Sequence, residues 1–473
     1  MYIELNYSQC SFDAMPIGSS SENSSRIKEL ERACGFGPRS AKELMSALGV
    51  SQPTLSRTIQ SLPDVFTTFR VSGDRTPKYA MLRRLPGGLN PRQSISRISS
   101  AGSIEPFAEV EFLAGGATLE RTPEKTTLYE GLPPYMVFSS PAGFLGRQVA
   151  RGAAALDPQF PESLKDWGDD HRVAYLFTRG LNLAGNLVYG VASLQREMDF
   201  RRVVPTPAGQ VLDHYVQMAT QLKDSAHGSS AGGEQPKFLS LSEGVGHVIV
   251  KFAKLGARMA ELLPLEHEAL RALAAVGVPS AATRLLASND YVFLEVQRFD
   301  RVGAHGRVGM LSAGAIDDEF FGARDTWSEF AARCVQAGYL STRDARYVDV
   351  MAAFSELIGN TDRHFENISV LLGDDGEYSG IAPAYDILPM RYASIGGGVD
   401  PDLTPIVPKL STIGAKPDVW AVAAEAAERF WEAVRQDRLA LPASAAFQAL
   451  AADNLGVVRE FVAPLLPSTG RGA

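Results

Sequence analysis

Three polar side chains in the C-terminal half of the chain have the types and spacing that phosphoryl transfer requires. Asp362 stands five residues before Asn367, and Asp386 follows nineteen residues later. An aspartate can orient an attacking hydroxyl group and accept its proton, while an asparagine and a second aspartate can hold Mg²⁺ against nucleotide phosphates. We therefore predict Asp362 as the catalytic residue and Asn367 and Asp386 as metal ligands. The alternative is a polar loop in which these side chains cap helices.

A lysine at the end of an apolar run could bind the phosphates of the nucleotide. Lys251 follows the apolar residues 248–250, and a cation on such a strand can pair with the α- and β-phosphates of ATP. The helix expected after it carries Glu266 and Glu268, either of which could form the ion pair that orients the lysine. We favour Glu268. Without such a partner, the lysine would be a solvated strand end.

A segment rich in small residues precedes this strand. Residues 228–237 read Gly-Ser-Ser-Ala-Gly-Gly-Glu-Gln-Pro-Lys, and glycines such as Gly232 and Gly233 let backbone amides approach phosphate oxygens closely. The Gly-x4-Gly-Lys-Ser/Thr order of a Walker A loop is absent. Because a flexible linker has a similar composition, the interpretation as a phosphate-binding loop depends on the position of this segment before the lysine strand.

The elements expected upstream form a separate small domain. Three helices and two strands are predicted, at 26–34, 40–48, 51–62, 65–71 and 78–82. Ser40 and Glu43 suit a capping box, and Gly49 suits the left-handed turn that ends the second helix. Two helices joined by a glycine-containing turn and followed by a hairpin have the order of a winged helix-turn-helix domain.

The charge and the polar residues of this domain favour DNA as its partner. Residues 26–97 carry 13 Lys/Arg against 5 Asp/Glu, whereas residues 98–473 carry 33 against 46. In a winged helix the third helix enters the major groove and the wing contacts the backbone. The candidate DNA-contacting residues are Gln52, Thr54, Ser56, Arg57 and Gln60 on the third helix and Arg75 and Lys78 on the wing. The alternative is a protein-docking module with a solvated basic face.

Bulk properties exclude several other classes of protein. The 473 residues are 45% hydrophobic and 21% charged, which is typical of a globular protein of two or three domains. No apolar run is long enough to span a membrane, and the polar N-terminus lacks the order of a signal peptide, so we expect a cytoplasmic protein. Three widely spaced cysteines predict neither a disulfide framework nor a zinc site.

These motifs, taken in their order along the chain, resemble those of HipA-family toxin kinases. The resemblance covers roughly residues 107–440 and rests on the segments 230–237, 250–251, 297–301, 359–367 and 385–386. It implies a two-lobed fold related to eukaryotic protein kinases, with ATP and Mg²⁺ as cofactors and a protein Ser/Thr as substrate. The whole chain also resembles the subgroup of this family in which a helix-turn-helix domain is fused to the kinase.

The resemblance implies roles for individual residues. It assigns catalysis to Asp362, metal binding to Asn367 and Asp386, and nucleotide binding to Lys251. Residues Gln297 to Phe299 would form the hinge against adenine. Family members autophosphorylate a serine in the glycine-rich loop, and the matching residue is Ser230, with Ser229 as the neighbour that a one-residue shift would select. A phosphate there would repel the loop from the phosphate-binding site.

Two residues depart from the family pattern. Glu366 stands where a lysine commonly precedes the metal-binding asparagine, which places a negative charge beside Mg²⁺ and phosphate. Gln297 stands where a glutamate is common in the hinge. The first change could alter the choice of substrate or weaken phosphoryl transfer.

We therefore predict an α+β chain with a two-lobed, protein-kinase-like (HipA-like) fold preceded by a small winged helix-turn-helix domain. The expected parts are a flexible N-terminus (1–25), the winged domain (26–86), a linker (87–106), a lobe with the glycine-rich loop and ATP lysine (107–300) and a helical lobe with the catalytic motifs (301–465). The expected function is an autophosphorylating Ser/Thr protein kinase that binds DNA. Expected partners are a protein substrate, an antitoxin and a second copy of the chain, but no membrane. A regulator that only senses nucleotide and a small-molecule kinase are the alternatives.

Overall fold

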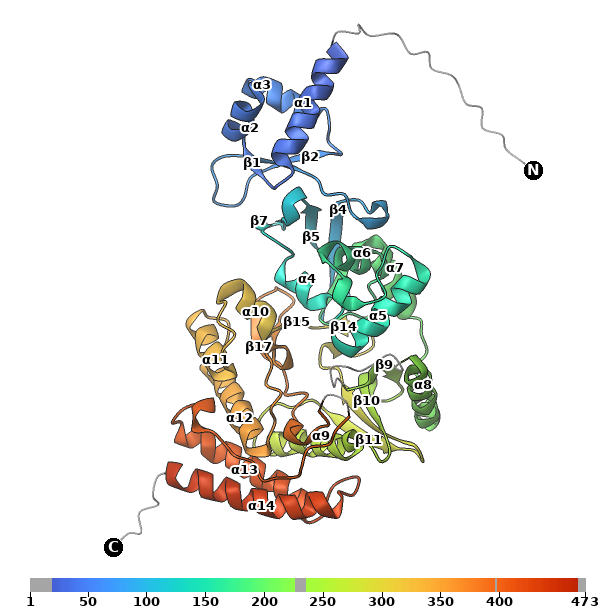
Figure 1. Cartoon of the computed structure of the whole chain (residues 1–473), viewed down its shortest axis with the longest axis vertical. Helices are drawn as coiled ribbons and strands as arrows, with labels where there is room; N and C mark the ends of the chain where they lie inside the picture. Colours follow the sequence, from blue (N-terminus) through green and yellow to red (C-terminus); the bar gives the residue numbers. More distant parts are fainter. Residues whose placement is uncertain (1–18, 226–234, 396–397, 467–473) are drawn as a thin grey trace, which may run out of the picture. The chain divides into compact units, whose positions relative to one another are not determined.

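The computed structural model describes residues 19–225, 235–395 and 398–466. The chain forms two compact units, Met1–Gln93 with Ala108–Leu132, and Ser94–Phe107 with Pro133–Ala473. Figure 1 labels many of the helices and strands of both units. In the described part of the chain, no helix is long and apolar enough to cross a membrane.

The first unit begins with three helices and a three-stranded antiparallel sheet of order β1-β3-β2. Its elements are α1 (Ser19–Cys34), β1 (Arg39–Ser40), α2 (Ala41–Leu48), α3 (Gln52–Gln60), β2 (Phe66–Phe69) and β3 (Lys78–Met81). The expected capping box of Ser40 and Glu43 is present, and Gly49 adopts the left-handed conformation with φ 63°. Apolar side chains from all three helices and from β2 and β3 bury one small core, which includes Leu30, Leu44, Leu55, Phe66 and Tyr79.

One detail of this region differs from the sequence-based expectation. Helix α1 begins at Ser19, so the stretch expected to be a flexible N-terminus already contains helix at 19–25. The polar run there offers no apolar period from which a helix could be predicted. Ser51 stands at the N-cap of α3, but its hydroxyl group bonds to that of Thr54 at 3.0 Å instead of capping the backbone.

The segment expected to be a linker at 87–106 contains β4 (Arg92–Ile98) and the start of β5 (Ile104–Phe112). Strands β5, β6 (Thr118–Arg121) and β7 (Thr126–Tyr129) follow one another in the chain, and the paired parts of β5–β6 and β6–β7 are antiparallel. In the first unit, Leu113, Ala117 and Leu119 share a buried cluster with Phe69 and Leu82. Strands β2 and β3 therefore contribute to two neighbouring clusters, one shared with the three helices and one shared with this later part of the unit.

The second unit contains a mainly helical region from Pro134 to Ser225. Its elements are α4 (Pro134–Ser139), α5 (Gly143–Leu156), α6 (Asp169–Arg179), β8 (Leu187–Tyr189), α7 (Gly190–Phe200) and α8 (Val211–Ser225). Strand β8 pairs with β4 through Ile95 and Tyr189. Tyr189 is fully buried, and its hydroxyl group donates to the carbonyl of Tyr135 at 3.0 Å.

A four-stranded antiparallel sheet of order β11-β12-β10-β9 positions the lysine strand. Its strands are β9 (Lys237–Ser242), β10 (Gly246–Lys254), β11 (Thr283–Ala287) and β12 (Tyr291–Gln297). Val248, Val250 and Phe252 of β10 pack in one cluster with α8, while Ala253 packs in another with α9 (Arg258–Ala275). Because side chains alternate along a strand, Lys251 lies on the face opposite to Val250 and Phe252.

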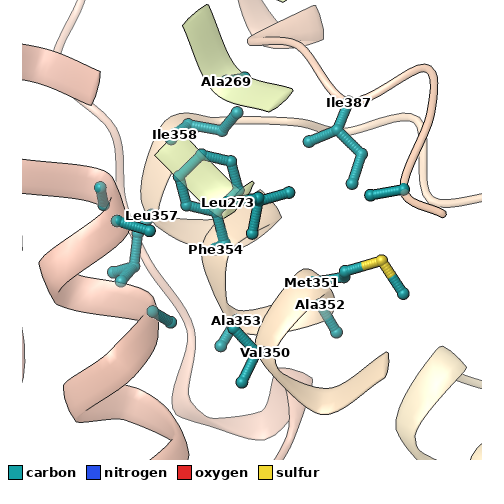
Figure 2. Packing of buried hydrophobic residues seen from close by; sticks show 14 of the residues in the cluster. Ala269, Leu273, Val350, Met351, Ala352, Ala353, Phe354, Leu357, Ile358 and Ile387 are labelled. Carbon is teal, nitrogen blue, oxygen red and sulfur yellow. The ribbon is translucent and has the colours of Figure 1, made fainter. Parts of the chain in front are cut away.

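The C-terminal part is mainly helical. It contains β13 (Arg301–Val302), β14 (Gly306–Arg307), β15 (Gly309–Ser312), α10 (Ala313–Phe320), α11 (Trp327–Gln336), α12 (Thr342–Ile358), β16 (Ser369–Leu372), β17 (Tyr378–Ile381), α13 (Pro417–Arg435) and α14 (Ala445–Val462). Its core joins α9 to α12, and Figure 2 shows Leu273 of α9 close to Phe354 of α12. Strands β15, β16 and β17 form a small antiparallel sheet. The catalytic motif ends just before β16 begins.

The buried cysteines give a test of this packing. Burial raises the pKa of the Cys34 thiol to about 11 and that of Cys334 to about 12. Because the thiolate is the reactive form, neither should react with a disulfide reagent at pH 8 until the protein unfolds. Thiol titration with and without urea, followed by mass spectrometry of the labelled peptides, measures this. Rapid native labelling of Cys34 or Cys334 would contradict the packing described.

Candidate active site

The centre of the candidate site is the buried ammonium group of Lys251. Its Nζ atom lies 2.6 Å from Glu266 Oε1 and 2.6 Å from Asp386 Oδ1, and only 6% of the lysine side chain is exposed. A buried charge is tolerated only where it is paired, and here two carboxylates share one cation. The three residues come from β10, from α9 and from the segment after β17, so one lysine connects three distant parts of the sequence.

The partner of Lys251 on α9 is Glu266, which corrects the preference for Glu268. Two positions apart on a helix differ by about 200° in direction, so only one of these acids can face the lysine strand. Glu268 instead binds Arg271 at 3.0 Å on the other side of the helix. Apolar residues surround both glutamates in the sequence, and the helical period alone therefore did not distinguish them.

Asp386 combines a strained backbone with a strongly acidic carboxyl group. Its φ of 55° lies in the left-handed region, which aspartate tolerates better than most residues. Burial would raise the pKa of Asp386, but the charges of Lys251 and Lys237 outweigh it and hold the pKa at about 2. The neighbouring Tyr385 hydroxyl group donates to the carbonyl of Glu366 at 2.9 Å, which ties this segment to the catalytic motif.

The catalytic motif begins where α12 ends. Gly359 adopts φ 77° and terminates the helix, and the fully buried Asn360 follows it. The Asn360 side-chain oxygen accepts the backbone N–H of Asp362 at 3.0 Å, while Arg363 donates to the Asn360 carbonyl at 2.9 Å. Asn360 thus fixes the turn that presents Asp362, a role that the sequence analysis did not assign to it.

Asp362 and Asn367 lie together at the end of this loop. Asn367 Nδ2 donates to the Asp362 carbonyl at 2.8 Å and lies 3.4 Å from Asp362 Oδ2. This arrangement leaves the side-chain oxygen of Asn367 as a candidate metal ligand. His364 Nε2 lies 2.5 Å from Asp362 Oδ1, so the imidazole positions the carboxylate from the solvent side.

Glu366 is paired with a cation. Its Oε1 lies 2.8 Å from Arg324 Nη1, and Arg324 also binds Asp318 through two hydrogen bonds of 2.7 and 2.6 Å. The backbone of the Arg324 loop is held by Asp317, which is fully buried and accepts the N–H groups of Ala323 and Arg324. The negative charge that the sequence places beside the metal-binding asparagine is therefore partly neutralised.

A cleft of about 440 Å³ is lined by five of the predicted nucleotide- and metal-binding residues, whereas the predicted catalytic Asp362 is not among its lining residues. Those that line it include Lys251, Gln297, Phe299, Asn367 and Asp386, together with Lys237 and Glu266, which the sequence analysis did not select. Aliphatic side chains also line it, among them Leu239, Ile249 and Val296. An apolar cleft with a few convergent polar groups is the usual form of a small-molecule site.

The donor atoms of the cleft suit Mg²⁺ bound together with a phosphate ligand. Magnesium is typically held by one or two carboxylates plus phosphate oxygens and not by a cage of protein ligands. Asp386 and Asn367 supply two such oxygens. The described residues contain no cluster of three or more His, Cys, Asp or Glu side chains able to hold a metal on their own.

Several predicted residues are not among the described residues that line the cleft. Ser229, Ser230, Gly232 and Gly233 fall outside the described residues. The candidate DNA-contacting residues belong to the first unit and are not part of the cleft. Of these, Gln52, Arg57, Gln60 and Arg75 are exposed, whereas Thr54, Ser56 and Lys78 are half-buried. Lys78 is paired with Asp74 at 3.2 Å.

Comparison with known proteins finds relatives over most of the chain. Residues 89–198 match the model of a YjjJ-like toxin, middle domain, and residues 229–451 match that of a HipA-like C-terminal domain. The chain is 30% identical over 413 residues to Toxin YjjJ of Escherichia coli (strain K12), which covers 85% of this chain and 91% of the relative.

Two solved structures are more distant. A chain of the Shewanella oneidensis MR-1 HipA, HipB and operator DNA complex has 14% identity and a TM-score of 0.44, over 79% of this chain and 96% of that chain. The Helicobacter pylori proinflammatory kinase CtkA has 10% identity and a TM-score of 0.36, over 48% of this chain and 92% of that chain.

The two glutamates of α9 provide a matched pair for testing the lysine site. Glu266→Gln removes one carboxylate from a buried ammonium group and should lower the free energy of unfolding by about 3 kcal/mol. Glu268→Gln removes a pair with the largely exposed Arg271 and should change it by less than about 1 kcal/mol. All four tryptophans lie in the second unit, so urea unfolding followed by their fluorescence reports on this site. Equal losses in both variants would contradict the assignment of Glu266.

Proposed function

This chain belongs to the family of HipA-like toxins represented by Toxin YjjJ, and from that premise we propose that it is an ATP- and Mg²⁺-dependent Ser/Thr protein kinase. The observation that carries the proposal is the buried contact of Lys251 with both Glu266 and Asp386 at one end of an apolar cleft. A lysine held in this way can bind nucleotide phosphates at a fixed position.

Different residues of the cleft would have different roles in phosphoryl transfer. Leu239, Ile249, Val296 and Phe299 provide the apolar walls that would enclose the adenine ring. Lys251 would bind the α- and β-phosphates while Glu266 keeps its ammonium group oriented. The side-chain oxygens of Asn367 and Asp386 would hold Mg²⁺, which, when bound, neutralises the phosphate oxygens and the charge that develops on them.

Asp362 would act on the attacking hydroxyl group of the substrate. Its position is set by Asn360 through the backbone and by Asn367 through the side chain, while His364 contacts the second carboxylate oxygen. A carboxylate fixed in this way orients the hydroxyl group and accepts its proton as the phosphoryl group is transferred. The proposed substrate is a Ser or Thr of another protein and, within this chain, Ser230 or its neighbour Ser229.

A second proposed activity is DNA binding by the first unit, with α1 to β3 acting as a winged helix-turn-helix domain. The exposed side chains of Gln52, Arg57 and Gln60 on α3 support it, as does the basic surplus of residues 26–97. Arginine pairs with guanine and glutamine with adenine in the major groove. A separate antitoxin stays a prediction from the family resemblance, and a homodimer stays a prediction from the paired half-sites that winged-helix proteins often bind.

The rival proposal is a DNA-binding regulator whose kinase-like part only senses nucleotide. Glu366 favours it, because a negative charge beside the metal site opposes phosphate binding. The pairing of Glu366 with Arg324 weakens that argument, and a protein that merely binds nucleotide has no need for the ordered contacts around Asp362.

Autophosphorylation tests the kinase proposal. Incubation of the full chain with Mg²⁺ and γ-labelled ATP should label a peptide that contains Ser229 and Ser230. Asp362→Asn should reduce the rate by about 10²- to 10⁴-fold because the general base is lost, while nucleotide binding is retained. Mass spectrometry locates the phosphate. A wild-type protein that is freed of earlier phosphate and binds ATP, yet incorporates no label, would favour the nucleotide-sensing regulator.

Binding to selected DNA tests the second activity. A duplex site is first selected from a random pool with the full chain. Arg57→Ala should then weaken binding to that site by about 1–3 kcal/mol but change binding to scrambled DNA little, if Arg57 contacts a base. Arg75→Ala, on the hairpin, should weaken both alike, as expected of a phosphate contact. Titrations at one salt concentration measure this, and equal losses on both duplexes for Arg57→Ala would reject base contact.

A further inference from the structure

A buried cluster of charges lies beside the hinge, outside the catalytic residues. Arg298 binds Asp300 through two hydrogen bonds of 2.9 and 2.7 Å, and Arg301 reaches the same carboxylate at 2.8 Å. Arg307 pairs with Glu197 at 2.5 Å. Every one of these side chains is at most 6% exposed. The cluster therefore holds three guanidinium groups against two carboxylates and is short of one negative charge.

Two of these arginines also have unused hydrogen-bond donors. Arg301 Nε and Arg307 Nη1 are buried and have no partner within the part of the chain that the structure describes, and the same holds for Nδ1 of His247. Buried polar groups are rarely left unpaired, because each one costs the free energy of its lost hydration. Unsatisfied donors on two separate cations indicate an acceptor that is not part of the protein.

A cavity of about 320 Å³ adjoins these residues. Arg301, Arg307 and His247 all line it, and Arg201 adds a further cation. The acidic residues that line it are Glu197, already paired with Arg307, and Glu243, which accepts the backbone N–H of Ala208. Its walls come from α7, from the β9–β10 turn and from the β13–β14 hairpin, and it lies entirely within the second unit.

The ionisation of the lining groups reflects this excess of positive charge. Burial lowers the pKa of His247 to about 4, and the nearby Arg301, Arg298 and Arg307 lower it in the same direction. Burial and the charge of Arg298 also lower the pKa of Arg301. A bound anion would offset the part of both shifts that comes from the neighbouring positive charges.

We propose that this cavity is a binding site for a small phosphate-bearing anion, held by Arg301, Arg307 and Arg201. Donors on several arginines suit a tetrahedral oxyanion with several acceptor oxygens better than the two oxygens of a carboxylate. The volume leaves room for a small organic group attached to the phosphate. The site is separate from the lysine of the nucleotide cleft. The proposal of an anion site is therefore independent of the proposed kinase activity.

Titration of the full chain with inorganic phosphate, without nucleotide and at constant ionic strength, tests the site. Calorimetry should show binding to the wild type. Arg307→Gln should weaken it by about 10- to 100-fold, the range expected for one charge-assisted hydrogen bond. Arg201→Gln, at a half-buried position outside the paired cluster, should weaken it as well and serves if Arg307→Gln does not fold.

Two control variants separate this site from others. Lys237→Met removes a half-buried cation that lines the nucleotide cleft and should leave the measured affinity unchanged. Arg202→Gln removes an exposed neighbouring charge and should also leave it unchanged. Tighter binding of glycerol 3-phosphate than of phosphate would identify a phosphorylated metabolite as the source of the anion.

Three results would overturn the proposal. They are no binding of phosphate to the wild type, binding that Lys237→Met abolishes, and binding of succinate in place of phosphate.

Discussion

The rest of the second unit depends on one interaction, the pairing of the buried Lys251 ammonium group with two carboxylates. Placing a charge in a protein interior costs several kcal/mol unless its partners are held in good geometry. Two carboxylates meet that requirement only if α9 packs with Glu266 facing β10 and if the segment after β17 carries Asp386 to the same point. The pairing therefore restricts the arrangement of a strand, a helix and a loop at once.

The catalytic loop is built on a second constraint, the way in which α12 ends. A left-handed Gly359 stops the helix, and the buried Asn360 immediately uses its side chain to hold the backbone of Asp362. Phe365 and the strand β16 then anchor the other end of the loop in the core. The loop is thus rigid at both ends although its central side chains reach solvent. Tyr385 links it to Asp386, so the two metal-binding candidates are positioned by one connected set of hydrogen bonds.

The sequence predicted those parts of the structure whose determinants are local. The capping box at Ser40, the left-handed Gly49, the lysine strand and the spacing of Asp362 and Asn367 all depend on residues within a few positions of one another. The choice between Glu266 and Glu268 depends on which face of α9 meets a strand that the chain forms earlier, and no local pattern contains that information. No local pattern predicts β4 either. Its buried residues Ile95 and Ile98 are three positions apart and do not show the alternation of a half-exposed strand. The pairing of Arg324 with Glu366 joins residues 42 positions apart and depends on the loop that Asp317 holds.

That last pairing changes the meaning of Glu366. Considered as an isolated residue, it places a negative charge next to a metal ligand and suggests that phosphate binding is lost. In the folded protein the carboxylate shares a guanidinium group with Asp318, and this guanidinium stacks over the Phe365 ring at 5.7 Å. Gly314 in α10 leaves the space that this arrangement needs, because a Cβ there would lie 2.4 Å from Glu366 Oε1. Three features accommodate the side chain of Glu366. The buried Asp317 holds the loop, Gly314 lies at the point of contact, and Arg324 has a left-handed backbone conformation. Glu366 is therefore held by specific contacts within the site. Its presence is a weak argument that the site has lost the ability to bind phosphate.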